Sequence, residues 1–285
     1  MIELFNFYYF LYITFAFGLL FGLYFFLRNK SKKTQVIVLF SVLFSSFALH
    51  FLRLSFASYQ EWMPYAIRTV TPENICSVSV LVFPWIFLTK NVILKDYIFY
   101  MGFISGIAAT VFPIDVIGFS VIDPETIRFY YAHIVLWVVP SLMVLLRLHT
   151  LDYKRIPKIP LLAFAAQCVI LVNEIILIGA GFVHINHLFS NDIRNSALIF
   201  GPLADVEFVG IIFTALTPEI FLTVPVGPRA GEAFYWPILW LAIPFYLYSC
   251  VAALLLSLPF ERKKITSDIK SLYMKVKLKL KAACA

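Results

Sequence analysis

Two side chains of this sequence, Cys76 and His133, could act together as a nucleophile and its base. Each lies in a long apolar run, and His133 is the only histidine or charged residue between Arg128 and Arg147. A thiol among apolar groups is unreactive unless a base or a cation lies beside it, and an imidazole is such a base. Taken separately, a buried cysteine packs as a small hydrophobic residue, and an intramembrane histidine commonly hydrogen-bonds a neighbouring helix. Brought together, they predict nucleophilic chemistry at sulfur, with the imidazole accepting and returning the proton.

The elements that carry these residues are predicted to be membrane-spanning helices. The 285 residues are 61% hydrophobic, 18% aromatic and only 14% charged, and the mean hydropathy is +0.88. Charge-poor runs of about 20 residues match the thickness of a bilayer. The net charge of +7 comes from basic residues at the ends of these runs, where they set topology, so we expect no nucleic-acid partner. The composition indicates an all-α, polytopic membrane protein.

Seven segments are predicted to span the membrane as a helix bundle. They cover roughly residues 5–27, 35–57, 74–89, 97–115, 128–149, 161–184 and 233–258. The stretch 206–224 is also apolar, but Pro218 and Glu219 interrupt it, so we expect a re-entrant or interfacial segment there. We therefore predict a transmembrane bundle domain over residues 1–260, followed by a cytoplasmic tail over residues 261–285.

Lysine and arginine residues predict the orientation of this bundle. Eighteen of the 23 fall in the first, third and fifth loops and in the tail, and the other five are Arg53, Arg68, Arg128, Arg194 and Arg229. Basic loops stay in the cytoplasm, so seven spans with the N-terminus outside separate the two sets completely.

The tail has the pattern of an amphipathic helix. Apolar residues recur every three or four positions among its lysines, at Ile265, Ile269, Leu272, Val276 and Leu280. Such a helix lies on anionic lipid and gains about 1 kcal/mol for each lysine near the surface. The alternative is a solvated basic tail.

The polar residues of the spans are predicted to lie in one layer near the outer side. Cys76 and His133 begin the third and fifth spans there, on the order of 5–10 Å below the boundary at 1.5 Å per residue. Six further residues of this layer are expected to bind substrate: His50, Arg53, Asn74, Asp115, Asn173 and Glu174. A charge at the centre of a span costs about 2.5–3.5 kcal/mol, so several in one layer imply a shared polar cavity.

Three residues of this layer have simpler, structural interpretations. Arg53 and Glu174 would form an internal ion pair or hold a lipid headgroup, and Asp115 would cap its span at the interface. Asn74, Ser77, Asn173 and the backbone amides near Cys76 are candidate oxyanion donors.

Two other features of the sequence have a chemical interpretation. His184 and His187 have a spacing that could hold a metal, but no third ligand is evident, so we predict neither a metal nor a cofactor. Pro140 is expected to kink the fifth span, which would open the cavity toward lipid.

One block of the sequence resembles a known family. The pattern YY-x-H-x-x-x-x-VVP, from Tyr130 to Pro140, resembles the YwaF-like integral membrane proteins and their eukaryotic relatives, the transmembrane (TMEM) ether-phospholipid acyltransferases. Further matching residues are Asn74-Ile75-Cys76, Phe112-Pro113, Pro124-Glu125 and Leu258-Pro259-Phe260. The resemblance implies that Cys76 accepts the acyl group and that His133 is its catalytic partner. The eukaryotic members have a histidine directly after the cysteine, where this chain has Ser77.

The sequence therefore predicts a lipid acyltransferase or transacylase of the membrane, most simply of a bacterial cell membrane. Cys76 would take an acyl chain from a phospholipid and His133 would activate a lysophospholipid to receive it. A site that opens to the outer leaflet is closed to cytosolic acyl-CoA, which favours a phospholipid donor. A lipid hydrolase is a close variant, and a small-solute transporter or binding component and a noncatalytic scaffold subunit are the alternatives. Protein partners are not indicated.

Overall fold

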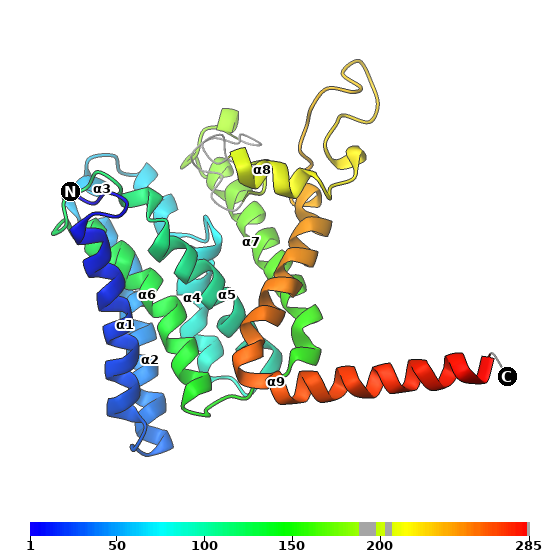
Figure 1. The fold of residues 1–285 in the computed structure, drawn as a ribbon. Coiled ribbons are helices and arrows are strands. Elements are labelled where there is room, and N and C mark those ends of the chain that lie inside the picture. The colour runs from blue at the N-terminus through cyan, green and yellow to red at the C-terminus, as the bar shows by residue number, and fades with distance from the viewer. Residues whose placement is uncertain (188–197, 203–206, 284–285) are drawn as a thin grey trace.

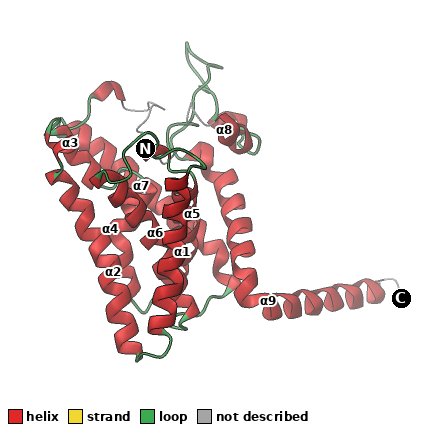
Figure 2. Cartoon of the chain, turned by 60° about the vertical axis from the view of Figure 1, so that its left-hand side comes forward, coloured by secondary structure: helices red, strands yellow, loops and turns green. Residues whose placement is uncertain are grey.

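The computed structural model describes residues 1–187, 198–202 and 207–283, which fold as a bundle of helices (Figures 1 and 2). The α-helices are α1 (Phe7–Leu27), α2 (Lys32–Leu52), α3 (Ala57–Gln60), α4 (Ile75–Leu88), α5 (Val92–Val111), α6 (Pro124–Leu145), α7 (Ile159–Gly179), α8 (Glu207–Thr214) and α9 (Ala242–Ala283). Short 3-10 helices join them at η1 (Arg53–Ser55), η2 (Tyr65–Val70), η3 (Ile114–Val116), η4 (Tyr153–Lys158), η5 (Ile185–His187), η6 (Glu219–Phe221) and η7 (Leu239–Leu241).

The predicted polytopic membrane bundle is confirmed. Within the described ranges, six helical segments are long and apolar enough to cross a membrane: 7–27, 32–55, 92–116, 124–145, 153–179 and 239–277. The third predicted span is the exception, because α4 has only 14 residues and is about 21 Å long at 1.5 Å per residue, against about 30 Å for the hydrocarbon core. The chain before α4 folds over the end of the bundle instead of extending the helix.

The last span begins later than residue 233. Pro237 and Ile238 precede it, and Ile238 has φ 65°, a left-handed conformation that interrupts a helix. The stretch 206–224 contains the eight-residue helix α8, which lies across the end of the bundle near α7 and α9 (Figure 1). It does not cross the bundle.

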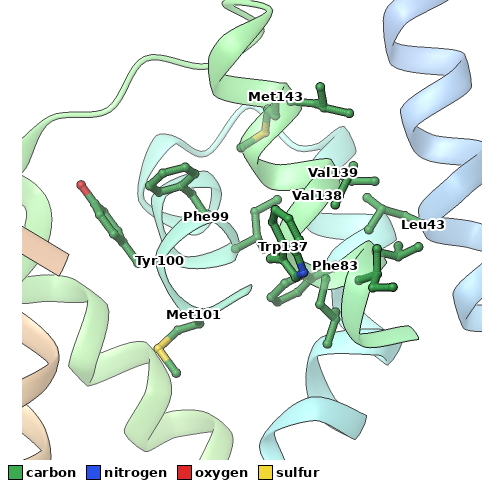
Figure 3. Close-up of a cluster of buried hydrophobic side chains, with 14 of the residues drawn as sticks. Leu43, Phe83, Phe99, Tyr100, Met101, Trp137, Val138, Val139 and Met143 are labelled. Carbon is green, nitrogen blue, oxygen red and sulfur yellow. The ribbon is translucent and has the colours of Figure 1, made fainter. Parts of the chain in front are cut away.

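Helix α6 is the centre of the bundle. Asp123 caps its first turn by accepting from the Glu125 amide at 2.8 Å, and Pro124 takes a position where its missing N–H costs nothing. From Ile134 to Val144 every residue of α6 is buried. Figure 3 shows Trp137, Val138, Val139 and Met143 in this core, together with side chains of the surrounding helices.

Two glycines on α5 allow it to pack closely on α6. A Cβ atom at Gly106 would lie 2.7 Å from the His133 carbonyl oxygen and 3.0 Å from Cδ1 of Trp137, and one at Gly102 would overlap the Leu136 carbonyl. Glycines four residues apart let two helix backbones approach in this way. The contact fixes the height of His133 against α5.

The basic loops gather at one end of the bundle, opposite the N-terminus (Figure 1). Lys32 Nζ donates to the Leu146 carbonyl, and buried Asp96 pairs with His149 Nε2 at 2.7 Å and with Arg155. These contacts join the first, third and fifth loops, as the charge pattern predicts.

The tail is the second half of α9. The helix continues through Pro259 and runs away from the bundle in both views (Figures 1 and 2). Its start is attached to η4, because Asp268 accepts from Tyr153 at 2.6 Å and pairs with Lys154 at 2.7 Å. Lys264 pairs with Asp152 at 2.8 Å. Beyond these contacts Ile269 and Tyr273 are exposed.

Candidate functional site

A polar cavity of about 530 Å³ lies at the end of the bundle that carries the N-terminus. Cys76 and His133 both line it, together with residues of α2, α4, α5 and α6 and of the chain between α2 and α4. Helices α2, α4 and α6 pack on one another, and α5 packs on α4 and α6. The shared polar cavity that the sequence predicts is therefore present.

Cys76 lies in the first turn of α4. Asn74 is the N-cap of this helix, and its Oδ1 accepts from the Ser77 amide at 2.8 Å. The first amides of a helix have no intrahelical partners, and the helix dipole is positive there. The helix dipole favours negative charge on the Cys76 sulfur or on an oxygen bound beside it, whereas burial of the thiol disfavours its ionisation.

His133 has a defined tautomer because one of its ring nitrogens meets a carbonyl. Nδ1 lies 2.7 Å from the Phe129 carbonyl oxygen, which only accepts hydrogen bonds, so Nδ1 carries the proton and donates it. Nε2 of the neutral ring is then the basic atom. The Phe129 ring, with its centroid 4.2 Å from that of the imidazole, packs against one side of the imidazole.

Cys76 and His133 are not hydrogen-bonded to each other in the described structure. The Cys76 thiol instead contacts Ser105 of α5, whose hydroxyl donates to the Met101 carbonyl at 2.7 Å. Catalytic hydrogen bonds are commonly long in empty sites and shorten when substrate binds.

An ion network of Arg53, Glu125 and Arg128 forms one wall of the cavity. Glu125 accepts from Arg53 Nη2 at 3.1 Å and from Arg128 Nε at 2.7 Å. Arg53 also donates to the Thr69 carbonyl and to the Tyr59 hydroxyl, while its buried Nε has no partner among the described atoms. The sequence offers Glu174 as a partner of Arg53, and at this wall the charged partner of Arg53 is Glu125.

His50 places a second imidazole on the cavity wall. It is 3% exposed, and its ring hydrogen-bonds the Val70 backbone. Its buried Nε2 has no partner in the part of the chain that is described. A buried polar atom without a partner costs about 1–3 kcal/mol, so this nitrogen is available to a bound polar group.

The other predicted site residues divide into two groups. Asn74 and Asp115 line the cavity, whereas its described lining does not include Asn173 or Glu174. Asn173 donates to the Thr71 hydroxyl at 3.0 Å and supports the chain that covers the cavity. Glu174 is buried within the bundle. Pro140 is also buried, about 10 Å further along α6 than His133 at 1.5 Å per residue, and does not open the cavity.

Several lining residues were missed because they lie between predicted spans, among them Tyr59, Trp62, Arg68, Glu73 and Glu125. Arg68 lies over the Trp62 ring at 5.7 Å and pairs with Glu73 at 3.8 Å. Burial raises the pKa of Glu73, and the Arg68 charge opposes that rise. The one signal for the first four of these residues in the sequence is the unusual number of charged and aromatic residues between the second and third predicted spans.

Comparison with known proteins gives one match. The model of a protein family, described as the TMEM164 family, matches residues 4–224, which include the whole polar cavity. No curated protein and no solved structure matches the chain.

Proposed function

The chain belongs to the TMEM164 family, and we propose that it is a membrane-embedded acyltransferase that moves acyl chains between lipids through a thioester on Cys76. One observation carries the proposal: a thiol at a helix N-terminus and an imidazole with a bare Nε2 line the same cavity within a membrane bundle. A nucleophile, a base and a source of positive potential are the groups that acyl transfer requires.

In the first half-reaction the Cys76 sulfur attacks the carbonyl carbon of a lipid ester. The thiol proton passes to His133 Nε2, and a tetrahedral oxyanion forms. When it collapses, the ester C–O bond breaks and the imidazolium returns the proton to the departing lipid oxygen. The acyl group remains on sulfur as a thioester, and the lysolipid leaves.

In the second half-reaction a lysolipid hydroxyl gives its proton to His133 Nε2 and attacks the thioester carbonyl. The C–S bond then breaks, and the sulfur recovers the proton. Both half-reactions need a donor for the oxyanion. The first amides of α4 are suited to this, and so is the Asn74 side-chain NH2, because the helix cap uses only its oxygen.

The charged wall of the cavity suits a phospholipid headgroup. Arginine binds phosphate through several donors in one plane, and Arg53, Arg68 and Arg128 all line the cavity. The partnerless Nε–H of Arg53 is available to an oxygen of such a headgroup, and the partnerless Nε2 of His50 accepts from a donor such as a headgroup hydroxyl or ammonium.

Intact-protein mass spectrometry after incubation of the purified protein with phospholipid tests the proposal. We expect wild type to gain the mass of one acyl chain, which hydroxylamine removes. Cys76→Ala should show no adduct, and His133→Ala should form it at least about 100-fold more slowly, the usual contribution of a general base. Cys168→Ala is the matched control, because Cys168 lies exposed on α7 outside the cavity and its loss should change nothing.

The fate of the adduct separates the related activities. Transfer to added lysophospholipid supports acyl transfer, and release as free fatty acid at the same rate with and without lysophospholipid would identify a hydrolase. The acyltransferase proposal is wrong if wild type forms no adduct, Cys76→Ala retains bound lipid and Arg53→Ala loses it. The cavity is then a binding or transport site.

A further inference from the structure

A second, apolar groove of about 760 Å³ lies between α1, α2 and α6. It falls in the usual size range of ligand pockets, about 300–1,000 Å³. Its walls include Leu11, Phe15, Leu49, Ile127 and Ile134. The groove exists because α1 and α2 both pack on α6 but make little contact with each other in the described structure, which leaves a strip of α6 open between them.

Two of the three tyrosines that line this groove, Tyr12 and Tyr131, have hydroxyls that are hydrogen-bonded within the protein, and the Tyr130 hydroxyl is buried without a partner among the described atoms. Tyr12 donates to the Val121 carbonyl at 2.8 Å, and the hydroxyls of Tyr131 and Ser45 are hydrogen-bonded at 2.6 Å. Tyr12 also stacks on Tyr130 with centroids 3.9 Å apart. With these hydroxyl groups of Tyr12 and Tyr131 bonded to the protein, the surface suits a hydrocarbon ligand.

Arg128 joins the groove to the polar cavity, because it lines both. It is the only charged residue in the described lining of the groove. In a phospholipid the ester group lies between the phosphate and the chain. A lipid with its phosphate at Arg128 can therefore place a chain in the groove while its ester lies at the junction with the cavity that holds Cys76 and His133.

We propose that this groove binds one acyl chain of a phospholipid whose phosphate contacts Arg128. The inference rests on the proposed function for its choice of lipid, but it concerns binding and does not require that the thioester forms. The contact of the phosphate with Arg128 makes the groove selective for a phospholipid, unlike the apolar surface that any bilayer lipid covers.

Photo-crosslinking tests the groove directly. Wild-type protein in lipid nanodiscs would receive phosphatidylcholine with a diazirine at the end of one acyl chain, or diacylglycerol with the same labelled chain. We expect the phosphatidylcholine probe to label Leu11 and Phe15 several-fold more strongly than the diacylglycerol probe does, because only the phospholipid carries a phosphate for Arg128. Equal labelling by both probes would overturn the role of Arg128.

A matched pair of substitutions tests whether the chain occupies the groove. Ile127→Trp fills the groove at a position that is 49% exposed and tolerates bulk, and Ile176→Trp adds the same bulk to the surface of α7, where Ile176 is 62% exposed. Labelling of Leu11 and Phe15 should fall several-fold in Ile127→Trp alone. If both variants label these residues like wild type, the chain does not bind in the groove.

Cys76→Ala separates this proposal from the proposed function. If groove labelling persists in Cys76→Ala and wild type forms no acyl adduct, the groove binds lipid and the acyl-transfer proposal is wrong. If wild type forms an acyl adduct but the groove is not labelled selectively, acyl transfer is supported and the proposal that the groove binds an acyl chain is wrong.

Discussion

Glu125 neutralises two guanidinium groups on the cavity wall, and this predicts the effect of removing its charge. Glu125→Gln leaves Arg53 and Arg128, whose side chains are 11% and 9% exposed, without their carboxylate. Breaking a buried ion pair in this way costs about 3–5 kcal/mol. We therefore expect a large fall in the thermal unfolding midpoint of the purified protein.

Glu232→Gln is the matched control for that substitution. Glu232 pairs with Arg229 at 2.7 Å, but the two side chains are 51% and 74% exposed, and such a pair contributes only about 0–1 kcal/mol. Its loss should leave the unfolding midpoint nearly unchanged. Similar shifts in both variants would mean that the Glu125 network is not shielded from solvent.

Glu73 predicts a pH dependence of stability. Burial raises its pKa in the folded protein above the unfolded value of about 4.3. Between these two values the folded state binds more protons than the unfolded state, so stability falls as the pH rises from the unfolded pKa through the folded one. Glu73→Gln removes this contribution and should flatten the curve of unfolding midpoint against pH over that range. A curve in the variant as steep as that of wild type would assign the dependence to other groups.

At the scale of elements, the contact of α5 with α6 predicts a steric effect on the site. Gly106→Ala places a methyl group 2.7 Å from the His133 carbonyl oxygen and forces the two helices apart. Overpacking of this kind costs about 1–3 kcal/mol, and it displaces His133 from the cavity wall. We expect both a lower unfolding midpoint and slower formation of the acyl adduct.

Gly18→Ala provides the control, because a Cβ atom at Gly18 on α1 meets nothing within 4 Å. Replacing a helical glycine with alanine is then favourable by up to about 1 kcal/mol. The two variants should therefore shift the unfolding midpoint in opposite directions. If the unfolding midpoint of Gly106→Ala is no lower than that of Gly18→Ala, α5 does not pack closely on α6 at this glycine.

The helices were predictable because each apolar run must satisfy its own backbone in the membrane. The common depth of Cys76 and His133 followed from the same runs, since both begin spans on one side. The pairing of Arg53 with Glu125 did not follow, because it depends on which helices are neighbours. Similarly, Glu73 and Tyr59 lie in a connection whose path across the bundle end is set by tertiary packing. The bounds of α4 were predicted to within one residue, but its 14 residues are too few to cross the hydrocarbon core, so its assignment as a full span rested on apolar composition and not on length.

At the scale of the whole molecule, the two ends of the bundle differ in chemistry. One end carries the N-terminus, and the other carries the basic loops and the start of the tail (Figure 1). The polar cavity lies at the end with the N-terminus. Cytoplasmic loops are enriched in lysine and arginine. We therefore predict that the cavity opens on the side of the membrane away from the cytoplasm.

Thiol labelling of intact cells tests this orientation, with Cys284 replaced by serine and one new cysteine at an exposed position. Glu61→Cys lies at the cavity end and Lys30→Cys in the first basic loop. A membrane-impermeant maleimide should label Glu61→Cys in intact cells, and Lys30→Cys only after the cells are opened. The parent chain without either substitution gives the background from the cysteines within the bundle. The opposite labelling pattern would mean that the cavity opens toward the cytoplasm, where acyl-CoA reaches it. The expected acyl donor would then be a soluble thioester and not a phospholipid.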